Sequence, residues 1–260
     1  MKQERLQAAY IGGPTALFEW HGFRLLTDPT FDPPGGKYQN GPVVLEKTIG
    51  PALAPEALGR VDTVLLSHDH HLDNLDHSGR RFLASVPRVI TTPEGAEPLG
   101  GNSVGFAVWQ SIDIAGGDGR VLRITGTPAQ HGPAHLQRGA VIGFVVALAD
   151  APGSAIYFSG DTVWFDRVAE VAQRFPIRAA VLFMGAARVP VVGPFALTMT
   201  AEDGVQAADA FSKATIVPIH FEGWKHLSES REVISRAFEA AGVSGREHWM
   251  EAGTVVDVGG

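Results

Sequence analysis

The sequence contains no cysteine among its 260 residues. Disulfides, thiolate-bound zinc, iron–sulfur clusters and a cysteine nucleophile are therefore excluded. Any metal ion must be bound through histidine, aspartate or glutamate, whose imidazole nitrogens and carboxylate oxygens suit divalent transition metals.

Long apolar runs and dense basic runs are also missing. Residues Met1–Leu6 carry charges where a signal peptide needs an apolar run, and no stretch of about eighteen apolar residues follows. We therefore expect a cytoplasmic protein without membrane insertion. The formal net charge is −7, from 28 acidic and 21 basic residues. Because neutralising nucleic-acid phosphates takes a basic stripe, we expect no nucleic-acid partner.

The composition is that of an ordinary globular protein, with 45% hydrophobic and 19% charged residues. Chains of this length with an α/β fold often form one domain, so we expect a single domain over residues 1–260. The oligomeric state is left open, and a homo-oligomer is compatible with the sequence.

The N-terminal part predicts a hairpin followed by a long loop. Tyr10–Trp20 and Phe23–Thr27 are rich in β-forming residues, and His21-Gly22 makes a two-residue connection between them. From Phe31 to Leu53 the chain carries too many prolines and glycines for regular structure, which predicts a loop. Long loops in compact domains are often functional.

Apolar runs predict further strands, and several are apolar throughout, which is typical of strands covered on both faces. They are Thr63–Leu66, Arg88–Thr91, Val121–Thr125, Ile142–Leu148, Ala155–Ser159, Ala179–Phe183, Thr215–Ile219 and Thr254–Val258. Helices are predicted from Thr200 to Phe211, opened by a capping-box pattern, and from Ser228 to Ala241. The mixed order favours two packed sheets flanked by helices.

Polar side chains stand at the ends of several predicted strands. They are His68, His131, Asp161 and His220. Each has an ordinary alternative when taken alone: a polar turn, a loop cap, a helix cap or a core histidine. Strand ends in layered α/β folds meet along one edge, so these side chains are expected to converge on a ligand.

The densest group is Ser67–Asn74, with the sequence Ser-His-Asp-His-His-Leu-Asp-Asn. Three histidines and two aspartates directly after a buried strand rarely serve packing. A solvated polar turn is the alternative, but the cluster favours a metal site.

The order of these motifs resembles the metallo-β-lactamase fold superfamily. The motifs are the histidine cluster, Ala129-Gln130-His131, Gly160-Asp161-Thr162 and Pro218-Ile219-His220. More narrowly, Thr27-Asp28-Pro29, Phe158–Thr162 and His220–Trp224 look like the branch of phosphorylated-ascorbate lactonase and the N-acyl-phosphatidylethanolamine phospholipase D group. The resemblance extends from about Tyr10 to Val258.

This resemblance implies an α/β fold, a four-layer α/β/β/α sandwich of two mixed β-sheets flanked by helices, with a metal site between the sheets. It implies one or two divalent ions, zinc first, with manganese or iron as alternatives. Two histidines of the cluster and His131 would bind the first ion. Asp73 and His220 would bind the second, and Asp161 would bridge both.

The cluster departs from the family pattern His-x-His-x-Asp-His. One extra residue lies between His68 and Asp73, and Asn74 stands where the last histidine belongs. His70 has the family's His-x-His spacing from His68, whereas His71 has its His-x-Asp spacing to Asp73. Either histidine is therefore a candidate ligand, and we slightly favour His71. An amide oxygen is a poor ligand for such metals, so a mononuclear site is the alternative to a dinuclear one.

The function expected is a metal-dependent hydrolase that uses a metal-bound hydroxide on an ester, lactone or phosphodiester bond of a small molecule. Asp73 would orient the water and take part in proton transfer, and His226 would act as general acid unless it is a surface histidine. Arg188 is a candidate for binding an anionic group. The alternatives are a nuclease of the same fold and a non-catalytic metal-binding sensor.

Overall fold

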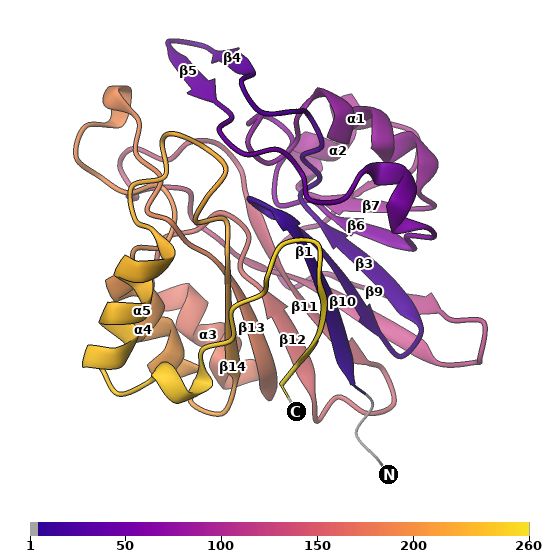
Figure 1. Cartoon of the computed structure of the whole chain (residues 1–260). Coiled ribbons are helices and arrows are strands. Elements are labelled where there is room, and N and C mark those ends of the chain that lie inside the picture. The colour runs from indigo at the N-terminus through magenta and orange to yellow at the C-terminus, as the bar shows by residue number, and fades with distance from the viewer. Residues whose placement is uncertain (1–4, 260) are drawn as a thin grey trace.

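The computed structural model describes residues 5–259, and two large sheets lie face to face in it (Figure 1). The first sheet has the strand order β15-β1-β2-β3-β6-β7-β8. Its strands are β1 (Leu6–Gly12), β2 (Thr15–Trp20), β3 (Phe23–Thr27), β6 (Thr63–Leu65), β7 (Val89–Thr91), β8 (Ser103–Gly105) and β15 (Val255–Val258).

The second sheet has the order β14-β13-β12-β11-β10-β9. Its strands are β9 (Ser111–Ala115), β10 (Val121–Pro128), β11 (Ile142–Leu148), β12 (Ala155–Phe158), β13 (Ile177–Phe183) and β14 (Thr215–Ile219). A separate two-stranded ribbon consists of β4 (Lys37–Asn40) and β5 (Val43–Glu46).

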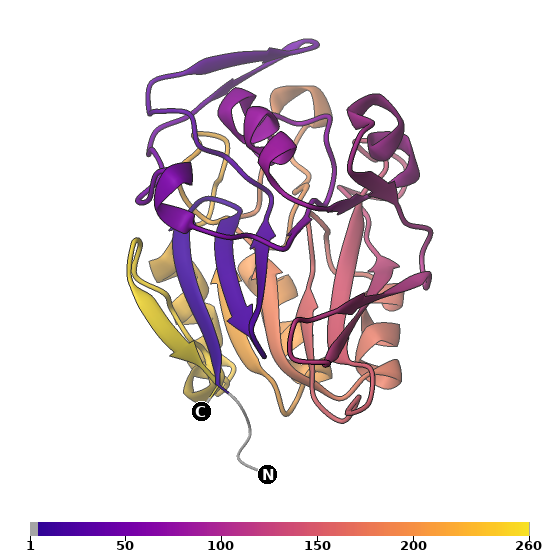
Figure 2. The ribbon, with the colours of Figure 1, turned by 90° about the vertical axis from the view of Figure 1, so that its right-hand side faces the viewer.

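Helices lie outside the two sheets (Figures 1 and 2). Those beside the first sheet are α1 (His77–Phe82) and α2 (Pro93–Leu99), and those beside the second are α3 (Asp166–Arg174), α4 (Ala201–Ala210) and α5 (Arg231–Ala240). Short 3₁₀ turns occur at Pro55–Leu58, Leu83–Ser85, Pro190–Val192 and Ser244–Arg246. The predicted α/β/β/α sandwich of two mixed sheets is confirmed. Within residues 5–259, no helix has the length and apolar character needed to cross a bilayer.

The main core lies between the two sheets. Strand β6 shows how alternation builds it, because successive side chains of a strand point to opposite faces. Leu65 packs into the core between the sheets, whereas Val64 and Leu66 belong to a second apolar cluster on the other face. Across the main core, the rings of Phe18 and Phe158 meet edge to face with centroids 5.0 Å apart.

The predicted N-terminal hairpin is confirmed, with one change. His21 (φ 52°) and Gly22 (φ 77°) connect β2 to β3, and two residues with positive φ suit the turn that matches strand twist. The single strand expected from Tyr10 to Trp20 is wrong, however. Gly13 (φ 57°) and Pro14 reverse the chain there and divide it into β1 and β2.

The prediction that residues 31–53 form only a loop is also wrong, because the β4–β5 ribbon lies within them. Its turn contains Gly41 with φ 57°. Tyr38 and Val43 are buried in a small apolar cluster with Trp224, far along the chain. These tertiary contacts hold strands that the local sequence does not predict.

The predicted helices are present, with shorter bounds. In α4 the capping box is complete, since Thr200 Oγ1 accepts from Asp203 N and Asp203 Oδ2 accepts from Thr200 N. Helix α5 begins at Arg231, three residues after the predicted start at Ser228. Helices α1 and α2, which have only 6 and 7 residues, were not predicted.

Candidate metal centre

The predicted site residues lie together because their strands end at one edge. Strands β10, β12, β13 and β14 run in the same direction, so their carboxyl ends point the same way. His131 follows β10, Asp161 follows β12 and His220 follows β14 directly. His68 comes after β6 of the first sheet. The structure thus brings all four predicted strand-end residues into one buried group.

Three histidine nitrogens converge in this group. His68 Nε2 lies 2.9 Å from His71 Nδ1, which lies 3.1 Å from His131 Nε2. Two nitrogens bound to one tetrahedral zinc at about 2.0–2.1 Å lie about 3.3 Å apart. All three side chains are buried. The spacing and burial therefore fit one divalent ion.

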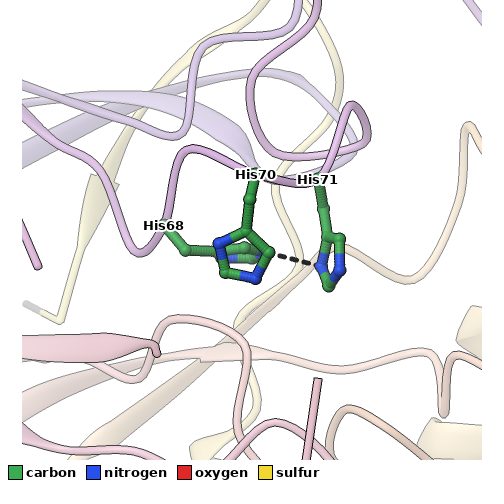
Figure 3. A group of neighbouring side chains, drawn as sticks. All are labelled: His68, His70 and His71. Atoms are coloured by element: carbon green, nitrogen blue, oxygen red, sulfur yellow. Dashed lines mark hydrogen bonds between the residues drawn. The ribbon is translucent and has the colours of Figure 1, made fainter. Parts of the chain in front are cut away.

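His70 and His71 differ in their surroundings (Figure 3). His71 is buried and contacts His68, as the dashed line shows. The His70 side chain is 37% exposed, and its Nε2 lies 2.7 Å from the carbonyl oxygen of Arg138, to which it donates. Ligand atoms of all three clustered histidines still lie within 4.8 Å of one another. The geometry favours His71 as the ligand.

Neighbouring groups orient the imidazoles. His131 Nδ1 donates to the carbonyl oxygen of Leu197 at 3.0 Å, which leaves the lone pair on Nε2 facing the cluster. Ser67 Oγ lies 2.9 Å from His68 Nδ1, so Nε2 of that ring is likewise directed inward. Asp28 accepts from Ser67 N at 2.6 Å. Asp28 therefore reaches His68 only through Ser67.

Burial and neighbouring charges keep His68, His71 and His131, the histidine trio, neutral. Burial, with the neighbouring His131 next in effect, lowers the pKa of His71 to about 3. Burial also lowers the pKa of His68 and of His131. Neutral imidazole is the form that binds metal ions, so these side chains need no deprotonation at neutral pH.

Two buried carboxylates lie beside the trio. Asp161 Oδ1 accepts from His220 Nδ1 at 3.0 Å, and Asp161 Oδ2 lies 3.8 Å from His131 Nε2. Asp73 Oδ2 accepts from His226 Nε2 at 2.9 Å. Burial alone would raise the pKa of both carboxyl groups, but His220 holds that of Asp161 below its usual range, and His226 does so for Asp73. Both acids are therefore ionised.

Some polar atoms of the centre have no hydrogen-bond partner among the described residues. Asp161 Oδ2 and His220 Nε2 are two of these buried atoms. Leaving such a group unpaired costs about 1–3 kcal/mol, and more when it is charged. A divalent cation bound to these atoms would remove that cost, so the residues present fit a metal ion.

The side-chain amide nitrogen of Asn74 contacts Asp28 and Ser67. Its Nδ2 donates to Asp28 Oδ2 at 3.3 Å and approaches Ser67 Oγ at 3.5 Å. Burial, followed by the charge of Asp161, raises the pKa of Asp28 to about 8. Asn74 therefore belongs to the support around the histidine cluster.

A pocket of about 330 Å³, partly open to solvent, adjoins the centre. Its lining residues are Val43, Leu45, His71, Asp73, His131, Arg138, Ala187, Val189, Leu197 and His226. His226, predicted as a catalytic residue, is thus brought to Asp73. Arg188 is exposed and donates to Ser228 Oγ and Pro194 O, outside the pocket. The sequence had pointed to this arginine, while Arg138, seven residues after His131, carried no motif to reveal it.

Gly160 sets the position of Asp161, and its replacement should disturb the centre. Its φ is +60°, and an added Cβ would lie 2.6 Å from Ile142 O and 2.8 Å from Ser67 Cβ. We expect Gly160→Ala to lower the free energy of unfolding by about 1–3 kcal/mol and to weaken metal binding. Denaturant unfolding and metal titration measure the two effects.

Gly100 offers the matched control. Its φ is +61°, but an added Cβ would meet no atom within 4 Å. Gly100→Ala should lower the free energy of unfolding through backbone strain alone and leave the metal affinity unchanged. Equal metal binding in the two variants would contradict the role assigned to Gly160.

Known proteins resemble this chain in sequence and in fold. The model of the beta-lactamase superfamily domain matches residues 23–221. A UPF0173 metal-dependent hydrolase of Nanoarchaeum equitans is 24% identical over 196 residues, covering 72% of this chain and 82% of that protein. Another from Pyrobaculum neutrophilum is 25% identical over 244 residues, covering 90% of this chain and 92% of that one.

Solved structures show the same fold over nearly the full length. An isothiocyanate hydrolase from Delia radicum gut bacteria superimposes with a TM-score of 0.80 at 23% identity, covering 98% of this chain and all of that one (100%). A metallo hydrolase from Ignicoccus hospitalis gives 0.69 at 19% identity, with 96% and 97% covered.

Proposed function

This chain belongs to the beta-lactamase superfamily, and from that premise we propose that it is a hydrolase acting on an ester, lactone or phosphodiester bond of a small molecule. Its relatives are metal-dependent hydrolases. The observation that carries the proposal is the convergence of the His68, His71 and His131 nitrogens beside a pocket. The narrower resemblance to lactonases and phospholipases remains a prediction.

Nitrogen and oxygen donors determine what the centre can bind. His68, His71 and His131 would hold the first ion, with Asp161 next to them. Zinc suits this donor set best, and manganese or iron are alternatives. When bound, such an ion polarises the bond under attack and makes a water molecule acidic enough to react near neutral pH.

Asp73 and His226 face the pocket and can handle protons. Asp73 is ionised, so its carboxylate can orient the attacking water and accept a proton from it. His226 Nε2, which donates to Asp73 Oδ2 at 2.9 Å, could pass its proton to the leaving group once that hydrogen bond breaks. These roles agree with those expected from the sequence.

The pocket walls support a small substrate with an apolar part. Val43 and Leu45 of the β4–β5 ribbon and Leu197 make part of the pocket lining apolar. Arg138 adds a cation to this lining and could pair with a carboxylate or phosphate. The pocket is narrow, with only about 20 Å³ open to the centre of a water molecule. We therefore propose a compact, partly apolar substrate that carries an acidic or polar group.

Metal removal tests the proposed function. We expect chelator-treated protein to lose turnover to the uncatalysed level and to regain it when Zn²⁺, Mn²⁺ or Fe²⁺ is restored. The assay panel should contain aryl esters, lactones, a phosphodiester and an aryl isothiocyanate, because one protein of this fold is an isothiocyanate hydrolase. The same chelator presaturated with Ca²⁺ is the control for effects unrelated to metal removal.

Absence of turnover on the whole panel by fully metal-loaded protein would count against the hydrolase. A non-catalytic metal-binding sensor would then explain the site better than a hydrolase. Activity that survives complete metal removal, verified by elemental analysis, would instead exclude a metal-dependent mechanism.

A further inference from the structure

Arg138 is the only lysine or arginine among the residues that line the pocket. Its side chain is half-buried, and in the part of the chain that the structure describes the guanidinium forms no hydrogen bond and no ion pair. Asp73, the carboxylate of the same lining, is paired with His226 instead. Because arginine stays protonated in proteins, the pocket contains a cation that no protein carboxylate neutralises.

Hydrogen bonds on both sides fix the backbone of Arg138 relative to the metal centre. Arg138 N donates to His131 O at 2.9 Å, which closes the loop that follows β10. His70 Nε2 donates to Arg138 O at 2.7 Å. His131 is a candidate ligand, and His70 directly precedes another, His71. The place of the arginine at the pocket is therefore tied to the place where an ion would bind.

Gly139 permits the close approach of His70 to this loop. Its φ is +101°, and an added Cβ would clash with the His70 ring. Glycine suits both the backbone conformation and the short distance. The structure thus gives His70 a contact with the loop that carries Arg138, whereas His71 faces the other two histidines of the trio.

The charges of the lining favour one class of anion. A guanidinium presents parallel N–H donors that match the two oxygens of a carboxylate. A phosphate monoester carries about 1.5–2 negative charges at pH 7, and the ionised Asp73 in the same lining would repel the additional charge. The narrow, partly apolar pocket also limits the size of the ligand. One unpaired cation therefore favours a compact group with a single negative charge.

We propose that Arg138 binds a carboxylate of the substrate, separate from the bond that is hydrolysed, and that His70 is the positioning residue that holds Arg138 in place. The inference rests on the proposed function, because it defines one group of the hydrolase's substrate. It assigns different tasks to two neighbouring histidines of the cluster. His71 faces the ion, and His70 supports the residue that selects the substrate.

Calorimetric titration with a matched pair of small ligands tests the inference without turnover. Metal-loaded full-length protein is titrated with isovalerate and with its neutral amide, isovaleramide. We expect the parent to bind the carboxylate at least about tenfold more tightly than the amide. Arg138→Gln should remove this preference and leave the bound metal unchanged. Arg188→Gln changes an exposed arginine outside the pocket lining, and this matched control should retain the preference.

Two variants of His70 test its positioning role. His70→Ala should weaken isovalerate binding by about two- to tenfold, the contribution of one hydrogen bond, and leave isovaleramide binding and bound metal unchanged. His70→Gln keeps an N–H donor and should restore part of the loss. Equal weakening of both ligands, or a loss of bound metal, would contradict the role assigned to His70.

The outcomes separate this inference from the proposed function. Equal affinity of the parent for the two ligands would overturn the carboxylate site. A preference that persists in Arg138→Gln would also overturn it, because the metal ion would then hold the anion. If Arg138→Gln does not fold, Arg138→Lys keeps the charge without the two-donor geometry, and an unchanged preference in that variant would overturn the site. A preference that depends on Arg138, in a protein that turns over no substrate of the panel, would instead remove the hydrolase and keep the carboxylate site.

Discussion

Replacing His71 with alanine should abolish metal-dependent turnover, whereas replacing His70 should leave most of it. His71 Nδ1 lies about midway between the inward nitrogens of His68 and His131, at 2.9 and 3.1 Å. His70 is partly exposed and bonded to the carbonyl of Arg138. Losing a ligand should lower kcat/KM by more than the roughly 10–100-fold expected for loss of a supporting contact. Steady-state kinetics and metal analysis measure both variants.

The pair His71→Ala and His70→Ala is internally matched, since both change neighbouring histidines of one loop (Figure 3). Bound metal should fall only in the first variant. Loss of metal in His70→Ala with retention in His71→Ala would reverse the assignment and restore the regular spacing from His68. Equal losses would mean that the loop, rather than one ligand, determines binding.

Lys47→Met should produce the largest loss of stability among the substitutions considered. Lys47 Nζ and Asp76 Oδ2 form an ion pair at 2.8 Å with side chains only 3% and 0% exposed. Removing the cation leaves a buried carboxylate that retains backbone donors from Phe31, Asp32 and Gly79. We expect a loss of about 3 kcal/mol, because breaking a buried pair leaves one charge uncompensated. Thermal unfolding should shift downward by roughly 6–12 °C.

Lys225→Met is the matched control for this change. Its ion pair with Glu46, at 3.1 Å, involves a lysine that is 69% exposed. Exposed pairs contribute only about 0–1 kcal/mol, so its melting temperature should hardly move. Equal shifts in the two variants would show that burial of the Lys47 pair adds nothing to stability.

Strands were predictable where the local sequence is apolar along its whole length. Ile142–Leu148 and Thr215–Ile219 are apolar along their length, and both have the predicted bounds in the structure. The ribbon over residues 37–46 escaped prediction because its stability comes from contacts with distant residues such as Trp224. The short helix α1 was hidden because it begins inside the polar stretch that follows the histidine cluster.

The residues of the site were predictable, but their contacts were not. Position at strand ends identified His68, His131, Asp161 and His220, because the direction of a strand determines where its last side chain lies. The choice between His70 and His71 depends on the path of a loop, which spacing alone does not define. Arg138 shows no motif, and only the three-dimensional fold places it in the pocket lining.

The β4–β5 ribbon contributes to the pocket lining from a part of the chain separate from the candidate metal ligands. Val43 and Leu45 line the pocket from a segment outside both large sheets, whereas the candidate metal ligands follow strands of those sheets. Lys47 anchors the end of this segment through Asp76. Substitutions at Val43 and Leu45 should therefore alter which molecules the pocket admits and leave the candidate metal ligands in place.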